Sequence, residues 1–132
     1  MHKIYTDCAT VLSLSPYQDE TGEVQVQTTS STFTIPATQA LRIGDEIWTI
    51  SKTRTAVGGT IIGVVRGKEV LFKNTETCPE AIKFSVLLAM SRSRGFNSLA
   101  EDDRIWLMEH NEHARECPDC LGALAGHKEL GG

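Results

Sequence analysis

The sequence predicts an α+β fold in which a small N-terminal β-barrel or sandwich is followed by an antiparallel helical hairpin. Residues 1–75 contain short runs rich in Val, Ile, Thr and aromatic residues, separated by turn residues, and both features are typical of strands. From Thr77 the spacing of the apolar residues becomes helical. Histidines and cysteines then gather between residues 110 and 120, where the second predicted helix ends.

Six strands are expected in the N-terminal segment. In residues 23–27 valines alternate with glutamines, which is the period of a half-buried strand. Closure into a barrel or sandwich would remove the exposed edges of such a sheet. Cys8 lies in the first run and is expected to be a buried core cysteine. The predicted strands are 3–15, 23–29, 32–35, 46–52, 60–65 and 69–73, and the predicted turns are 19–22, 43–45, the hairpin tip Gly58-Gly59 and 66–68.

Two helices are expected to follow. Residues 77–80 read Thr-Cys-Pro-Glu, a capping-box pattern, and the helix after them should end at Gly95. Residues 98–101 form a second capping-box pattern, and that helix is expected to run to about Glu116, where Pro118 stops it. The expected organisation is a β-rich lobe over 1–75, a helical hairpin over 76–124 and a flexible tail over 125–132.

Composition and charge narrow the possible environments and partners. The chain has 132 residues, 40% hydrophobic and 23% charged, as in soluble globular proteins. No apolar run approaches the roughly 20 residues of a membrane span, and the first residues lack the apolar core of a secretory signal. We therefore expect a cytoplasmic protein with reduced cysteines.

The net charge of −4 conceals a positive middle segment. Residues 1–50 carry a net charge of −4, residues 51–94 carry +5 and residues 95–132 carry −5. The middle segment could face nucleic acid or an acidic protein surface, or it could pair with the negative segments of the same chain. The candidate partner-binding cations are Lys52, Arg54, Arg66, Lys68, Lys73, Arg92 and Arg94.

The spacing H-x-x-H-x-x-x-C-x-x-C over residues 110–120 indicates a zinc site. His113 and Cys117 are four residues apart and so share one helix face, while Cys120 completes a C-x-x-C knuckle. A structural zinc ion needs a fourth ligand. Cys78 is the first choice, because an antiparallel hairpin brings the start of the first helix level with the end of the second. The alternatives are His127 and then His110, which lies roughly 10.5 Å along the helix axis from Cys117.

The set Cys78, His113, Cys117 and Cys120, with ECPDCLGAL over residues 116–124, resembles the helical hairpin of zinc-binding anti-sigma factors, the ZAS type. The resemblance covers residues 77–124 only. It implies one zinc ion held by these four residues and a partner in the transcription machinery. In that family the hairpin usually lies near the N-terminus and precedes further helices, whereas here it follows a β-rich segment.

A non-catalytic function is expected. A catalytic zinc keeps one coordination position open for water, whereas four protein ligands close the site. The H-E-x-x-H helix of metalloproteases is also absent from the sequence. We expect a zinc-binding regulator or inhibitor of a macromolecular partner, plausibly the transcription machinery. The alternatives are a direct nucleic-acid binder that uses the basic hairpins, and a structural component of a phage-type assembly, where similar cysteine knuckles occur.

Overall fold

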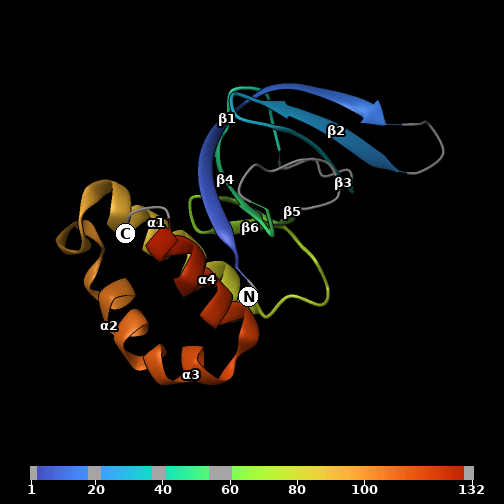
Figure 1. Cartoon of the computed structure of the whole chain (residues 1–132). Helices are drawn as coiled ribbons and strands as arrows, with labels where there is room; N and C mark the ends of the chain where they lie inside the picture. Colours follow the sequence, from blue (N-terminus) through green and yellow to red (C-terminus); the bar gives the residue numbers. More distant parts are fainter. Residues whose placement is uncertain (1–2, 18–21, 37–40, 54–60, 130–132) are drawn as a thin grey trace.

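The computed structural model describes residues 3–17, 22–36, 41–53 and 61–129. Six antiparallel strands form a half-barrel, and the helices that follow gather on one side of it (Figure 1). The strands are β1 Tyr5–Tyr17, β2 Glu23–Thr28, β3 Thr32–Pro36, β4 Glu46–Ser51, β5 Ile61–Arg66 and β6 Glu69–Lys73. The helices are α1 Pro79–Arg94, the short 3-10 helix η1 Phe96–Ser98, α2 Glu101–Glu109, α3 Asn111–Glu116 and α4 Pro118–Glu129.

The sheet confirms the predicted strands, and its order is β3-β2-β1-β4-β5-β6. Alternation works as expected in β2, where Val26 is buried and Gln27 is exposed. Among the described residues β3 and β6 stand at the two ends of the sheet and do not pair with each other. The sheet is therefore an open half-barrel and not a fully closed barrel. The predicted turns at 43–45 and 66–68 contain Gly44 and Gly67 with φ values of 92° and 63°, which favour glycine. The predicted tip Gly58-Gly59 and residues 19–21 lie outside the described residues.

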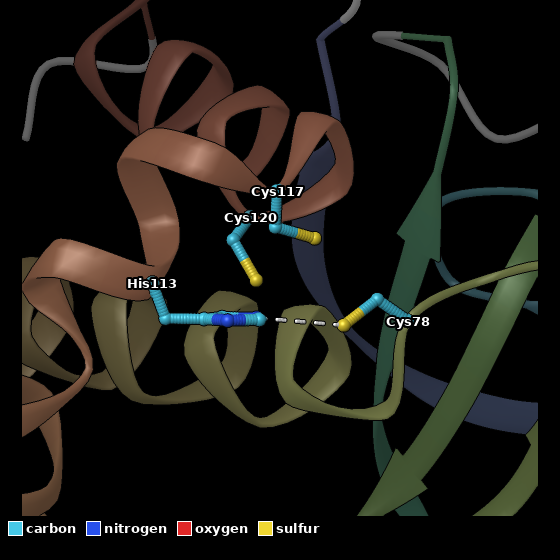
Figure 2. A group of neighbouring side chains, drawn as sticks. All are labelled: Cys78, His113, Cys117 and Cys120. Atoms are coloured by element: carbon cyan, nitrogen blue, oxygen red, sulfur yellow. Dashed lines mark hydrogen bonds between the residues drawn. The ribbon is translucent and has the colours of Figure 1, made fainter.

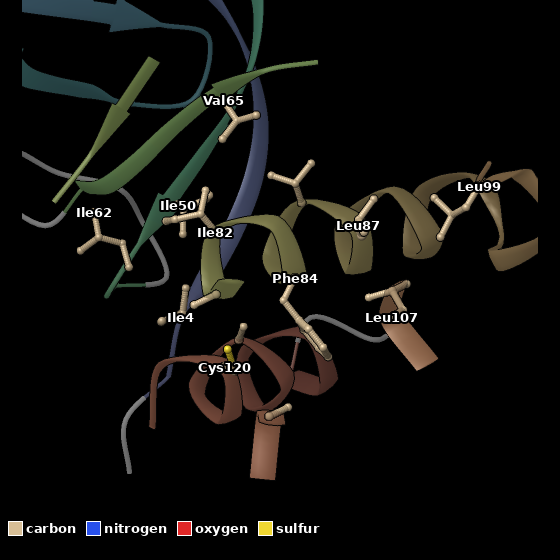
Figure 3. Packing of buried hydrophobic residues seen from close by; sticks show 14 residues of the cluster. Ile4, Ile50, Ile62, Val65, Ile82, Phe84, Leu87, Leu99, Leu107 and Cys120 are labelled. Atoms are coloured by element: carbon tan, nitrogen blue, oxygen red, sulfur yellow. The ribbon is translucent and has the colours of Figure 1, made fainter. Parts of the chain in front are cut away.

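The two faces of the sheet bury two separate cores. Neighbouring residues of β5 illustrate this, since Val64 packs with Val26 and Phe33 while Val65 packs with α1. This explains why the central strand β5 is apolar on both faces. The second core lies between the sheet and the helices, where Ile82 and other α1 residues meet the strands (Figure 3).

The second predicted helix is wrong in its details. It is broken into α2 and α3 at His110, and Pro118 begins α4 instead of ending the helical region, since proline fits the first turn of a helix. The main partner of α1 is α4 rather than α2. Neither predicted capping box forms, because the N-cap positions are Cys78 and Ala100 and neither side chain accepts a hydrogen bond from the helix backbone.

Helix α4 also corrects the predicted tail, since residues 125–129 are helical. The reason is close packing against the segment that leads into β1. The Ile4 backbone N–H donates to the Gly122 carbonyl over 2.9 Å, and the Ile4 backbone lies directly against Gly126. The absence of a side chain at Gly126 thus lets the N-terminal segment lie against the helix backbone. No helix among the described residues is long and apolar enough to cross a membrane.

Cys8 is exposed, so its expected burial is wrong. Thr6 and Ala9 are buried on either side of it, whereas Asp7 and Cys8 both face solvent. The strict alternation is interrupted here, where the chain passes from one core, which holds Ile4 just before β1, to the other, which holds Val11 of β1.

Substitution of Gly126 tests the packing of α4 on the N-terminal segment. A Cβ atom at this position would overlap the carbonyl oxygen of Ile4, and backbone cannot move aside cheaply. We expect Gly126→Ala to lower the free energy of unfolding by about 1–3 kcal/mol, measured by urea denaturation. Lys128→Ala, at an exposed position of the same helix, serves as the control and should change little. A Gly126→Ala protein as stable as the parent would refute this packing.

Candidate metal centre

Four potential ligands meet where α1, α3 and α4 converge. They are Cys78, His113, Cys117 and Cys120, and their sulfur and nitrogen donor atoms all lie within 4.8 Å of one another (Figure 2). This confirms that the first-choice residues come together. The Cys78 thiol is 3.8 Å from Nε2 of His113. Cys120 is buried, Cys78 and Cys117 are half-buried, and His113 is exposed, so the cluster lies at the edge of the core.

The local backbone explains how three of these side chains converge. Cys117 ends α3, and its N–H donates to the His113 carbonyl over 3.0 Å. Its own carbonyl accepts from Leu121 N–H at 2.9 Å, which begins α4. A helix end and a helix start therefore share one residue. This sharp change of direction brings Cys120 back toward His113.

The fourth ligand occupies an equivalent position at the start of another helix. Cys78 is the N-cap of α1 and is followed by Pro79 and Glu80, just as Cys117 is followed by Pro118 and Asp119. The two helix N-termini are joined by a hydrogen bond from the Cys78 backbone N–H to Oδ2 of Asp119 at 2.9 Å. Helix N-termini carry partial positive charge, which acts to lower the pKa of a thiol at both positions, although burial and Glu80 outweigh this at Cys78.

The thiols respond differently to this environment. Burial, and the hydrogen bond that the Cys78 thiol donates to Glu80 over 3.1 Å, raise the pKa of Cys78. Burial also acts to raise the pKa of Cys117, but the Cys120 backbone N–H and the two neighbouring thiols outweigh it, so this pKa is lowered. Burial raises the pKa of Cys120 strongly. Cys117 is therefore the thiol that ionises most readily.

The two alternative histidines make other contacts, although the His110 ring lies with its centroid 6.4 Å from that of His113. Nδ1 of His110 is 2.8 Å from the Trp106 carbonyl oxygen, and its ring stacks on the Trp106 ring with centroids 4.1 Å apart. His127 lies beside Arg92, with 3.4 Å between Nδ1 and Nη1. Burial and this neighbouring cation lower the pKa of His127. Neither histidine belongs to the four-residue cluster.

The predicted cations do not form one free basic surface. Arg66 pairs with Asp45 at 2.8 Å and with Glu69 at 3.1 Å. Lys68 pairs with the buried Asp103 at 2.9 Å, which joins the positive middle segment to the negative C-terminal segment. The Lys73 ammonium donates to the carbonyls of Asn74 and Thr77, and Arg92 donates to the Thr6 carbonyl. Lys52 and Arg94 are exposed, and Arg54 lies outside the described residues.

A cluster of three cysteines and one histidine could hold a metal ion such as zinc. Sequence analysis found these ligands but missed Glu80 and Asp119, which contact Cys78. The signal for them was present in the repeated tripeptide Cys-Pro-acidic residue at 78–80 and 117–119. Because proline is compatible with the end of a helix as well as with its start, the repeat does not by itself identify a second helix start at Pro118.

Comparison with protein-family models, curated proteins and solved structures finds no significant match for this chain. The resemblance to zinc-binding anti-sigma factors therefore extends to the ligand pattern alone.

Removal of the Asp119 carboxylate tests the link between the two helix starts. In Asp119→Ala the Cys78 N–H loses a charged acceptor, so we expect the free energy of unfolding to fall by about 1–3 kcal/mol. Metal binding should weaken by about 10–100-fold, as when other groups that orient ligands are removed. Urea denaturation would measure the free energy of unfolding, and competition with a metal indicator would measure the metal affinity. Glu116→Ala, an exposed carboxylate next to the cluster, is the matched control; equal behaviour of both variants would contradict the assignment.

Proposed function

We propose that the four side chains bind one structural zinc ion, and that the protein is a non-catalytic regulator that acts by binding a macromolecular partner. The observation that carries the proposal is the convergence of four donor atoms within 4.8 Å from residues as distant in sequence as Cys78 and Cys120. Three thiolates and one imidazole suit zinc, whereas magnesium and calcium prefer oxygen ligands.

A structural ion is favoured over a catalytic one by the number and origin of the ligands. Four protein ligands complete the tetrahedral shell of zinc, and a catalytic site would keep one position for water or substrate. Cys78 lies at the start of α1, and His113 lies in α3. Cys117 and Cys120 lie at the start of α4. One ion would therefore hold three helices together. Because the unfolded chain has no such site, the energy of binding zinc would add to the energy of folding.

A protein partner is favoured over nucleic acid by the contacts of the cations. Arg66, Lys68, Lys73 and Arg92 are engaged with carboxylates or carbonyls of the same chain. Nucleic-acid affinity depends mainly on contacts between cations and phosphates. These cations could contact phosphates only by breaking or sharing their present contacts within the chain. The choice of transcription machinery as the partner rests on the resemblance of the ligand pattern to anti-sigma factors.

Cobalt substitution and a cysteine series test the metal assignment. Co²⁺ bound by three thiolates should give intense visible and near-ultraviolet absorption at one equivalent per chain. We expect Cys78→Ser, Cys117→Ser and Cys120→Ser each to weaken that absorption and to lower stability. The matched control is Cys8→Ser, since Cys8 is an exposed cysteine outside the cluster. Normal cobalt spectra in the three cluster variants, or a loss caused by Cys8→Ser, would refute the proposal.

A further inference from the structure

The outward face of α2 combines exposed apolar side chains with carboxylates. Met108 is 71% exposed and Ile105 is 44% exposed, and their spacing of three residues places them side by side on the helix. Glu101, Asp102 and Glu109 are exposed on the same side, as helical spacing requires. We call these five residues the α2 face. The opposite side of α2 carries the buried Asp103 and Leu107, so the α2 face points away from the core.

The apolar part of the α2 face differs from the other exposed apolar residues of the described chain. The remaining large ones each lie in a different part of the chain, and single exposed residues of this kind are ordinary. They are Leu12, Ile43, Val70, Phe96 and Leu121. A pair on adjacent helical positions instead offers a partner one continuous contact surface. Met in particular adapts to the shape of an opposing apolar surface.

The charge around this pair defines the kind of partner. Residues 101–116 carry six carboxylates and two arginines. Five of the six carboxylates are exposed, and the sixth, Asp103, is buried and paired with Lys68. Arg104, the one basic residue of α2, is only half-exposed. An acidic rim attracts a basic partner and repels nucleic acid, anionic lipid and a second copy of the same face.

We propose that the α2 face binds a basic, amphipathic protein segment, whose apolar side chains cover Ile105 and Met108 while its lysines or arginines pair with the carboxylates of the rim. This inference rests on the proposed function and specifies the partner. It also gives the metal centre a role in binding, because His113 of α3 ties the α2–α3 segment to the starts of α1 and α4. An amphipathic helix laid against an apolar strip is a common mode of peptide recognition.

The test uses the full chain loaded with zinc and two synthetic helical peptides. One carries leucines on one face and lysines on the rest; the other has glutamates in place of the lysines. We expect the lysine peptide to bind in a saturable manner, to shift the amide NMR signals of residues 101–112, and to bind more weakly as salt increases. The glutamate peptide should bind at least about tenfold more weakly.

Variants then connect the binding to the α2 face. The double variant Ile105→Ser, Met108→Ser should weaken binding by about tenfold or more, and Glu109→Lys should weaken it further while reducing its salt dependence. Ile43→Ser is the matched control, because Ile43 is 66% exposed but lies in the turn before β4. We expect it to bind like the parent protein.

Several results would overturn the inference. The first is that the zinc-loaded protein does not bind the lysine peptide, and the second is that it binds both peptides equally. The third is that the lysine peptide shifts amide NMR signals only outside α2 and α3. The fourth is that Ile43→Ser and the double variant lose the same amount of peptide affinity. If the parent protein self-associates and the double variant does not, the α2 face would instead bind a second copy of this chain. The metal content of every sample separates the two proposals, since a zinc-loaded protein that ignores the peptide refutes the partner and leaves the metal site intact.

Discussion

The meeting of two helix N-termini is the constraint on which the helical half of this protein depends. The starts of α1 and α4 bring Cys78 and Cys117 together, and both sequences continue with proline and an acidic residue. Two positive helix ends repel each other unless negative groups lie between them. Asp119 and Glu80 provide negative charge there, and Cys117, whose pKa is lowered, ionises more readily than Cys78 or Cys120. A divalent metal bound by the cluster would offset the negative charge of its thiolates, so helix ends and metal would stabilise each other.

The same cluster is continuous with the hydrophobic core. Cys120 is both a proposed ligand and a fully buried member of the core between the sheet and α1. Its neighbours on α4 include Gly122 and Gly126, which contact the segment leading into β1. Any movement of α4 therefore affects the metal ligands, the core and the first strand together. Conversely, α2 contacts α1 much less than α4 does, so a metal ion bound by His113 would have more influence on the position of the α2–α3 segment.

The strands and ligands were predictable because each follows a local rule. Period-two alternation and turn residues identify the strands, and the spacing of His113, Cys117 and Cys120 identifies three ligands from helix geometry. The path of the helices was less predictable, because Pro118 is compatible with both ending one helix and beginning another. The helical tail depends on a contact between Ile4 and Gly126, residues too distant in sequence for any local pattern. Cys8 is likewise exposed where the chain passes from the core of Ile4 to the core of Val11, which no local pattern marks.

The most direct test of this account is the metal content of the purified protein, combined with its thermal melt before and after a strong chelator. The account predicts one zinc ion per chain and a large fall in the melting temperature when the metal is removed, because binding and folding are linked. Restoring zinc should restore the original melt. A protein purified without metal, whose melting temperature neither zinc nor chelator changes, would contradict the claim that a metal holds the helices together.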